Sequence, residues 1–332
     1  MDTEKNIRWD AANKLLGITG LNLTFHSNSM LGQLLARIGD EWFVIVEKSE
    51  ITQGNFGLVL QQLKETAQKA KRSILLLTRY IPASIAKYYV AEGMNYLDTA
   101  GNCFIRQGAL CVVVEGKKAE RKAKVNQPRA FQEAGIKLLY QLLLDPEKIN
   151  KPVRELAALA QISVGSVSTI IRELTDLQFI LQTKKKKILK NKPELLARWV
   201  VAYHDVLRPR LVIKRMNFTN PKDANWADLP LQDIPEKTIW GGEWAACWFT
   251  GSLTAESYTI YTDATWQTLG KTLKLIPEDT GKIEILRLFY KAAKDDTYVS
   301  PLLTYADLMG SGDSRNIETA KLICDRDLQH LK

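Results

Sequence analysis

The most regular alternation of hydrophobic and polar positions lies between residues 150 and 192. Pro152 precedes apolar residues spaced three or four apart, which predicts a helix beginning there. The polar break Gln161-Ile162-Ser163 ends this pattern, and Ser163 is a typical N-cap residue. Apolar positions then continue at helical spacing from Val164 to Leu177. Two short helices joined by a tight turn are therefore expected.

A hairpin with a basic tip is expected after the second helix. Residues 179–181 have the pattern of a strand, and Ile188-Leu189 has that of its return. The side chains on the polar face of the second helix are small enough for the helix to enter a major groove of DNA. Lysine side chains at the tip of a hairpin are suited to contact phosphates. The candidate DNA-contacting residues are Ser163, Gly165, Ser166, Ser168, Thr169, Arg172, Lys184, Lys185, Lys186 and Lys187. With the apolar helix expected at 131–144, the order predicts a winged helix-turn-helix over 130–199. The alternative is a helical hairpin with a solvated lysine loop.

The flanking segments predict two further domains. Residues 1–116 alternate between helix and strand, which indicates an α/β domain. Residues 117–129 form a basic linker, and residues 205–332 have the pattern of an α+β domain. Helices are expected at 12–16, 56–71, 82–90, 193–203, 241–249 and 305–328, the last broken at 310–313. Strands are expected at 30–38, 42–46, 73–80, 96–98, 103–106, 110–115, 208–213, 257–261, 273–275 and 283–288.

The net charge of +9 is unevenly distributed. Residues 117–215 contain 22 Lys and Arg against 9 Asp and Glu, whereas the rest of the chain contains 24 against 28. A basic middle between slightly acidic ends indicates a polyanionic partner at the middle. This partner is expected to be double-stranded DNA.

Composition excludes several classes of protein. No apolar run approaches the roughly 18 residues that a membrane helix needs, and the N-terminus has no signal-peptide pattern. A cytoplasmic protein without a membrane partner is therefore expected. The four cysteines lack metal-ligand spacing, and buried thiols such as Cys111 and Cys247 are expected in a reducing compartment. Neither a metal nor a cofactor is expected.

Two partial catalytic patterns are present. Asp98 followed by Glu115-Gly116-Lys117 matches the carboxylates and lysine of a metal-dependent nuclease. These residue types are common, so the favoured interpretation is that Asp98 bonds the Gly101-Asn102 turn. Gly251-Ser252 precedes Asp263 as in nucleotidyltransferases, but Thr265 stands where a second carboxylate is needed. The protein is therefore expected not to be an enzyme.

The tryptophans Trp240, Trp244 and Trp248 recur every four residues, with Trp266 further along. This spacing is more often core packing than a binding platform. Aromatic residues with a charged rim are nevertheless common at protein interfaces. We therefore hypothesise that residues 205–332 contact a protein partner.

The order of four motifs resembles the AbiEi-type antitoxins of type IV toxin–antitoxin systems, which are transcriptional regulators. The motifs are residues 96–102 (YLDTAGN), 152–180, 240–245 (WGGEWA) and 301–308 (PLLTYADL). The resemblance implies a protein that represses its own operon and neutralises a nucleotidyltransferase-like toxin. It also implies that residues 1–116 form an inactive domain with a restriction-endonuclease-like fold. The alternatives are a DNA-cleaving nuclease targeted by the helix-turn-helix and a pure interaction module for acidic protein or RNA.

Overall fold

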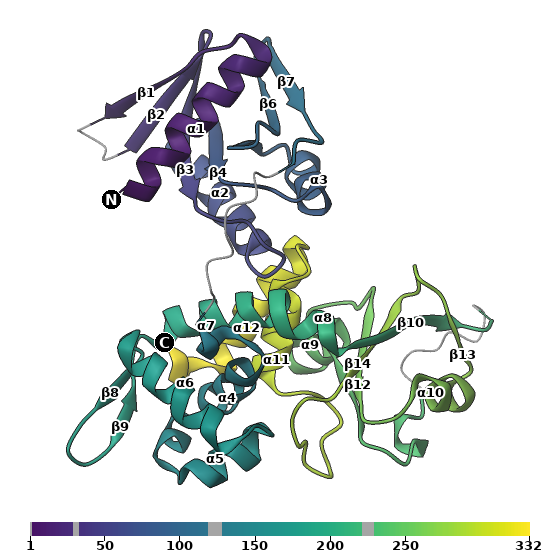
Figure 1. Cartoon of the computed structure of the whole chain (residues 1–332). Helices are drawn as coiled ribbons and strands as arrows, with labels where there is room; N and C mark the ends of the chain where they lie inside the picture. The colour runs from purple at the N-terminus through teal and green to yellow at the C-terminus, as the bar shows by residue number, and fades with distance from the viewer. Residues whose placement is uncertain (1, 29–32, 119–127, 221–228) are drawn as a thin grey trace. The chain divides into compact units, whose positions relative to one another are not determined.

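The computed structural model describes residues 2–28, 33–118, 128–220 and 229–332. The chain divides into two compact units, Met1–Lys124 and Val125–Lys332. Over these ranges the architecture is mixed α/β, with three sheets and many helices (Figure 1). No helix in the described ranges is both long and apolar enough to cross a membrane.

The first unit is built on a seven-stranded sheet whose strands lie in chain order. The strands are β1 (Leu23–Asn28), β2 (Gln33–Ile38), β3 (Glu41–Lys48), β4 (Ile74–Thr78), β5 (Asn95–Asp98), β6 (Cys103–Gln107) and β7 (Leu110–Val114). The pairs among β3, β4 and β5 are parallel, and the pairs on either side of them are antiparallel. The sequence analysis did not predict β1, because its exposed positions, Thr24 and His26, are polar.

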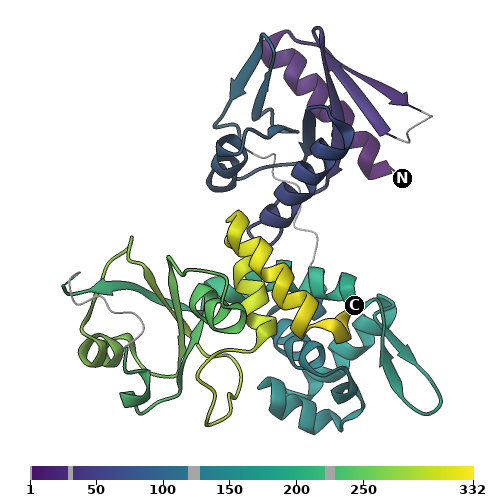
Figure 2. The ribbon, with the colours of Figure 1, turned by 180° about the vertical axis from the view of Figure 1, so that it is seen from behind.

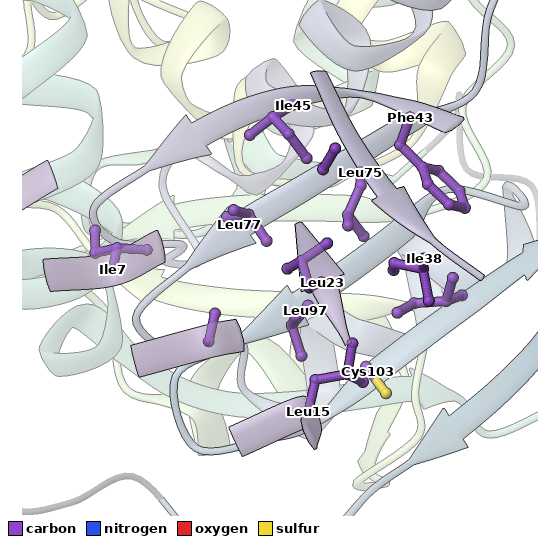
Figure 3. Close-up of a cluster of buried hydrophobic side chains, with 13 residues drawn as sticks. Ile7, Leu15, Leu23, Ile38, Phe43, Ile45, Leu75, Leu77, Leu97 and Cys103 are labelled. Atoms are coloured by element: carbon purple, nitrogen blue, oxygen red, sulfur yellow. The ribbon is translucent and has the colours of Figure 1, made fainter. Parts of the chain in front are cut away.

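Helices cover both faces of this sheet. α1 (Asp2–Thr19) is longer than the expected 12–16 because Ile7, Ala11 and Leu15 form one buried stripe against the sheet (Figure 3). α2 (Phe56–Ala70) and α3 (Ala83–Ala91) pack on the opposite face. Every residue of β4 is buried, as expected for a strand covered on both sides.

The second unit begins with a helical region followed by a hairpin. A 3₁₀ turn (Arg129–Phe131) leads into α4 (Glu133–Leu144), and a second (Pro146–Asn150) leads into α5 (Val153–Ala160) and α6 (Val164–Asp176). β8 (Ile180–Gln182) and β9 (Lys187–Leu189) form the antiparallel hairpin, and α7 (Lys192–Ala202) follows. The buried faces of these helices consist mainly of aliphatic side chains: Leu138, Leu139, Leu142, Leu156, Val167, Ile170 and Leu174.

The basic strand expected at 208–213 is wrong for its first four residues. The helix of α7 continues through a π-helical turn (Tyr203–Leu207) and α8 (Arg208–Leu211), and only then does strand β10 (Val212–Phe218) begin. Helical spacing buries Tyr203, Leu207 and Leu211 on one side. It also turns Arg208 inward to pair with two carboxylates, a partnership that the local sequence could not reveal.

A five-stranded sheet forms the rest of this unit, in the order β11-β12-β14-β10-β13. Its other strands are β11 (Thr238–Gly241), β12 (Tyr258–Thr262), β13 (Leu275–Pro277) and β14 (Ile283–Arg287). The helices are α9 (Gly242–Thr250), α10 (Trp266–Leu273), α11 (Pro301–Met309) and α12 (Ser314–Asp327). The strand expected at 273–275 is largely wrong, because Leu273 ends α10, and neither α10 nor β11 was predicted.

The helical region and this sheet share one aromatic core. The ring of Tyr140 on α4 stacks on Trp199 of α7 and also contacts Phe289 and Tyr290, which follow β14. Its hydroxyl lies 2.9 Å from the Ser300 hydroxyl at the start of α11. Figure 2 shows α11 and α12, in yellow, running beside the helical region as well as the sheet. The second unit is therefore held together through α7 and α11.

Candidate nucleic-acid interface

The turn between α5 and α6 is organised by its own backbone and by Ser163. Gln161 adopts the left-handed conformation at φ 53°, which lets the chain reverse after α5. The Ser163 hydroxyl accepts the Ser166 N–H at 3.2 Å, so Ser163 caps α6 as predicted. The two serine hydroxyls also lie 2.8 Å apart. Ser163 and Ser166 thus stabilise the first turn of the helix, and their hydroxyl groups hydrogen-bond to each other.

α6 presents a small, polar surface to solvent. Gly165, Ser168 and Arg172 are exposed, whereas Ser166 and Thr169 are half-buried. The Thr169 hydroxyl donates to the Gly165 carbonyl at 3.1 Å. Gly165, Ser168 and Arg172, at a spacing of three and four, therefore lie on one accessible face.

Val164 departs from the sequence analysis, which placed it on the apolar face of the second helix. Its side chain is 47% exposed, because it occupies the first helical position, ahead of the buried stripe that starts at Val167. An exposed apolar side chain beside polar ones can contact a thymine methyl group in the major groove.

The lysine-rich tip of the β8–β9 hairpin is a tight turn held by Thr183. The Thr183 hydroxyl accepts the backbone N–H groups of Lys185 and Lys186 and donates to the Lys186 carbonyl. Lys184, Lys185 and Lys186 are exposed, and Lys187 is half-buried at the start of β9. The tip therefore holds its ammonium groups outward on an ordered backbone.

Asn150, which the sequence analysis missed, ties the hairpin to the turn before α5. Its side-chain oxygen accepts the Lys187 N–H at 2.8 Å, and its amide donates to the Lys187 carbonyl at 3.2 Å. Glu147 in the same turn lies 3.9 Å from the Lys186 ammonium. Only the position of Asn150, next to a predicted helix start, could have drawn attention to it. Arg154 on α5 is also exposed near the start of that helix.

The nuclease candidates of the first unit do not converge on an open site. Asp98 is fully buried, and its carboxylate accepts the N–H groups of Ile81, Ala100 and Asn102 and the side-chain amide of Asn102. Burial raises the pKa of Asp98, although these hydrogen bonds act in the opposite direction. Asp98 thus bonds the turn at Gly101-Asn102, as the favoured interpretation had it.

Glu115 and Lys117 follow the end of β7. Glu115 is exposed, and the backbone of Lys117 exchanges hydrogen bonds of 2.8 and 3.0 Å with the Asn102 side chain. Asn102 therefore separates Asp98 from this segment and bonds to both. Across the described ranges, no group of three or more His, Cys, Asp or Glu side chains is arranged to hold a metal ion.

The tryptophans of the second unit divide between core and surface. Trp240 is buried, Trp244 and Trp266 are half-buried, and Trp248 is 68% exposed and stacked on Tyr298 at 5.1 Å between ring centroids. Asp263 is exposed after β12, and Thr265 caps α10 by accepting the Thr268 N–H. The structure therefore uses Thr265 for helix capping, at the position where a nucleotidyltransferase needs its second carboxylate.

Comparison with known proteins gives a family match over part of the second unit. Residues 187–329 match a family model described as a transcriptional regulator, the AbiEi antitoxin of a type IV toxin–antitoxin system. The matched range contains the 240–245 and 301–308 motifs and lies entirely C-terminal to the α5–α6 pair. No curated protein and no solved structure matches the chain. The predicted resemblance is thus confirmed over residues 187–329, which match the family of AbiEi antitoxin transcriptional regulators.

Proposed function

We propose that the protein is a DNA-binding transcriptional regulator that contacts double-stranded DNA through α6 and the β8–β9 hairpin. The observation that carries this proposal is the pairing of an exposed small-polar helix face with an ordered lysine tip. α4, α5, α6 and the hairpin follow each other in the order of a winged helix-turn-helix. Gly165, Ser168 and Arg172 would approach base edges, while Lys184, Lys185 and Lys186 would neutralise phosphates.

Substitutions in α6 and substitutions in the β8–β9 hairpin should then change DNA binding in different ways. The α6 double variant Ser168→Ala, Arg172→Ala, which changes the two exposed side chains of that face, should lose its preference for the operator over random DNA. The variant with Lys184 to Lys187 changed to alanine should bind all DNA more weakly and show a flatter salt dependence. Gel shifts at two salt concentrations, with DNA from upstream of the protein's own gene and random DNA, measure both effects. Equal loss on both DNAs from both variants contradicts this division of roles.

The match over 187–329 supports an extension of this proposal to antitoxin activity. The protein would repress its own operon and neutralise a toxin encoded beside it, with a nucleotidyltransferase-like protein as the expected toxin. The full chain co-expressed with that toxin should restore growth, as should residues 125–332 alone, and residues 1–124 should not. Rescue by residues 1–124 would place the antitoxin activity outside the matched range.

A nuclease is the rival function, and the burial of Asp98 argues against it. Supercoiled plasmid incubated with the protein and Mg²⁺ or Mn²⁺ should stay intact. Nicking that disappears in Asp98→Ala would support the rival. We propose that the first unit is an inactive domain with the restriction-endonuclease-like fold that the resemblance to AbiEi antitoxins implies.

A further inference from the structure

β7 is an edge strand with unusual composition. It closes the seven-stranded sheet, pairs with β6 on one side, and pairs with no other strand in the described ranges (Figures 1 and 2). Its five residues, Leu110 to Val114, are all apolar, and its register with β6 has no bulge. Natural edge strands usually carry charge, proline or a bulge that prevents pairing with another chain. β7 carries none of these.

The side chains of β7 are also incompletely covered. Leu110, Val112 and Val114 pack against the core beneath α1. Cys111 and Val113 alternate to the other face, where both are exposed, Val113 at 54%. The sequence analysis expected Cys111 to be buried, and this is wrong because α2 and α3 do not extend over β7. The apolar side chains of β7 therefore lie at an edge of the sheet that no other strand covers in the described ranges.

The hairpin geometry identifies which backbone groups point outward. Gln107 pairs with Leu110 across the two-residue turn Gly108-Ala109, with Gly108 at φ 54°. The pair that flanks such a turn exchanges hydrogen bonds, and bonded pairs then alternate along the ladder. Leu110, Val112 and Val114 consequently direct their N–H and C=O groups toward β6. Those of Cys111 and Val113 point away from the sheet.

We propose that β7 pairs antiparallel with β7 of a second copy of this chain, with the two-fold axis at Val112. In this register Cys111 faces Val113 of the other copy, and their outward N–H and C=O groups bond across the axis. All five residues overlap, and Glu115 faces Ala109 of the other copy, so no like charges oppose each other. Isologous pairing of this kind suits an uncharged strand that can match its own sequence.

The strength of this contact should be modest. One strand pair of five residues buries well below the roughly 1,000 Å² expected of a stable interface. The dimer should therefore depend on protein concentration.

Sedimentation of the full chain without DNA tests the proposal. The average mass should rise toward twice the monomer mass as concentration increases. Val113→Lys should keep the protein monomeric over the same range, because it places two like charges at the contact. Thr24→Lys, at an exposed position on β1 at the opposite edge, should behave like the parent. A parent that stays monomeric, or a Val113→Lys variant that dimerises equally, overturns the proposal. Because DNA is absent, neither result bears on the proposed DNA binding.

Cross-linking tests the register independently. Val112 should face its own copy in a non-bonded pair, with Cα atoms about 4.5 Å apart, a separation that a disulfide accepts. Val112→Cys in a Cys111→Ser background should form a reducible covalent dimer on mild oxidation. Cys111→Ser alone, and Thr24→Cys in that same background, should not. No cross-link from Val112→Cys, or equal cross-linking from Thr24→Cys, contradicts this geometry.

Discussion

At the scale of single residues, buried polar groups hold the π-helical turn against α11. The Asp307 carboxylate accepts the hydroxyls of Tyr203 and Tyr261 at 3.0 and 2.9 Å and is paired with Arg208. Burial raises the pKa of Asp307, while the Arg208 guanidinium opposes this. Arg208 also pairs with Glu284 of β14, so one guanidinium joins the helix, the sheet and α11.

His204 lies beside this network and bonds to a backbone carbonyl of α11. Its Nε2 lies 2.7 Å from the Ala306 carbonyl and donates to it, because a carbonyl can only accept. Burial, followed by repulsion from Arg208, lowers the pKa of His204 to about 3. The imidazole is therefore neutral in the folded protein at any ordinary pH.

This depressed pKa predicts a stability loss in mild acid. Below the ordinary pKa of 6.5 the unfolded chain takes up a proton at His204 and the folded chain does not. The free energy of unfolding should therefore fall as the pH drops from about 6.5, by up to about 1.4 kcal/mol per pH unit from this group. The loss should continue until the pH nears the folded value of about 3.

Urea unfolding followed by tryptophan fluorescence measures this effect. Six of the eight tryptophans lie in residues 125–332, so the signal reports mainly on the second unit. Between pH 7 and 5, the free energy of unfolding should fall less steeply in His204→Gln than in the parent. Parallel pH profiles for the two proteins would show that His204 does not carry the effect.

At the scale of elements, the hairpin depends on an anchor outside itself. β8 and β9 have three residues each, which is too short for independent stability. Asn150 holds the backbone of Lys187 from the turn before α5, so it sets where the lysine tip lies relative to α6.

Loss of this anchor should weaken DNA binding without changing its electrostatics. Two hydrogen bonds of about 1 kcal/mol each are lost in Asn150→Ala, so affinity should fall by about three- to thirtyfold. The slope of log affinity against log salt should stay unchanged, because no phosphate-neutralising charge is removed. Lys185→Ala is the matched comparison and should flatten the slope. A flatter slope in Asn150→Ala, or an unchanged affinity, would show that the anchor does not position the tip.

At the scale of the whole molecule, the second unit cannot be cut after α7 without opening its core. Tyr140, Trp199 and Tyr203 are completely buried, and their neighbours include Phe289 and Tyr290. The His330 ring near the C-terminus lies 2.8 Å from the Leu143 carbonyl of α4.

Two fragments of the second unit should therefore differ in folding and in DNA binding. Residues 125–332 should unfold cooperatively and retain DNA binding. Residues 128–199 should lack cooperative unfolding, because Tyr140 and Trp199 lose their cover and each buries on the order of 150–250 Å². Circular dichroism during heating and gel shifts with the same DNA compare the two. A cooperatively folded 128–199 fragment that binds as tightly as 125–332 would contradict this view.

The sequence alone determined the elements whose signals are local. Ser163, the polar break before it and the apolar spacing from Val167 to Leu174 predicted α6, its cap and its buried face. These features depend on backbone geometry and on neighbours within a few residues. The lysine tip and the charge contrast between the middle and the ends were equally visible, since charge requires no knowledge of packing. The resemblance to AbiEi antitoxins, carried by short motifs, was confirmed over residues 187–329.

Only the tertiary structure decided which surfaces are covered. Arg208 to Leu211 have the pattern of a strand but are helical, because Glu284 and Asp307, about 76 and 99 residues away, receive the guanidinium. Cys111 is exposed because α2 and α3 do not extend over its face of β7, and Asn150 acts on Lys187 across 37 residues. Burial and long-range hydrogen bonds depend on partners that are distant along the chain, so local patterns could not reveal them.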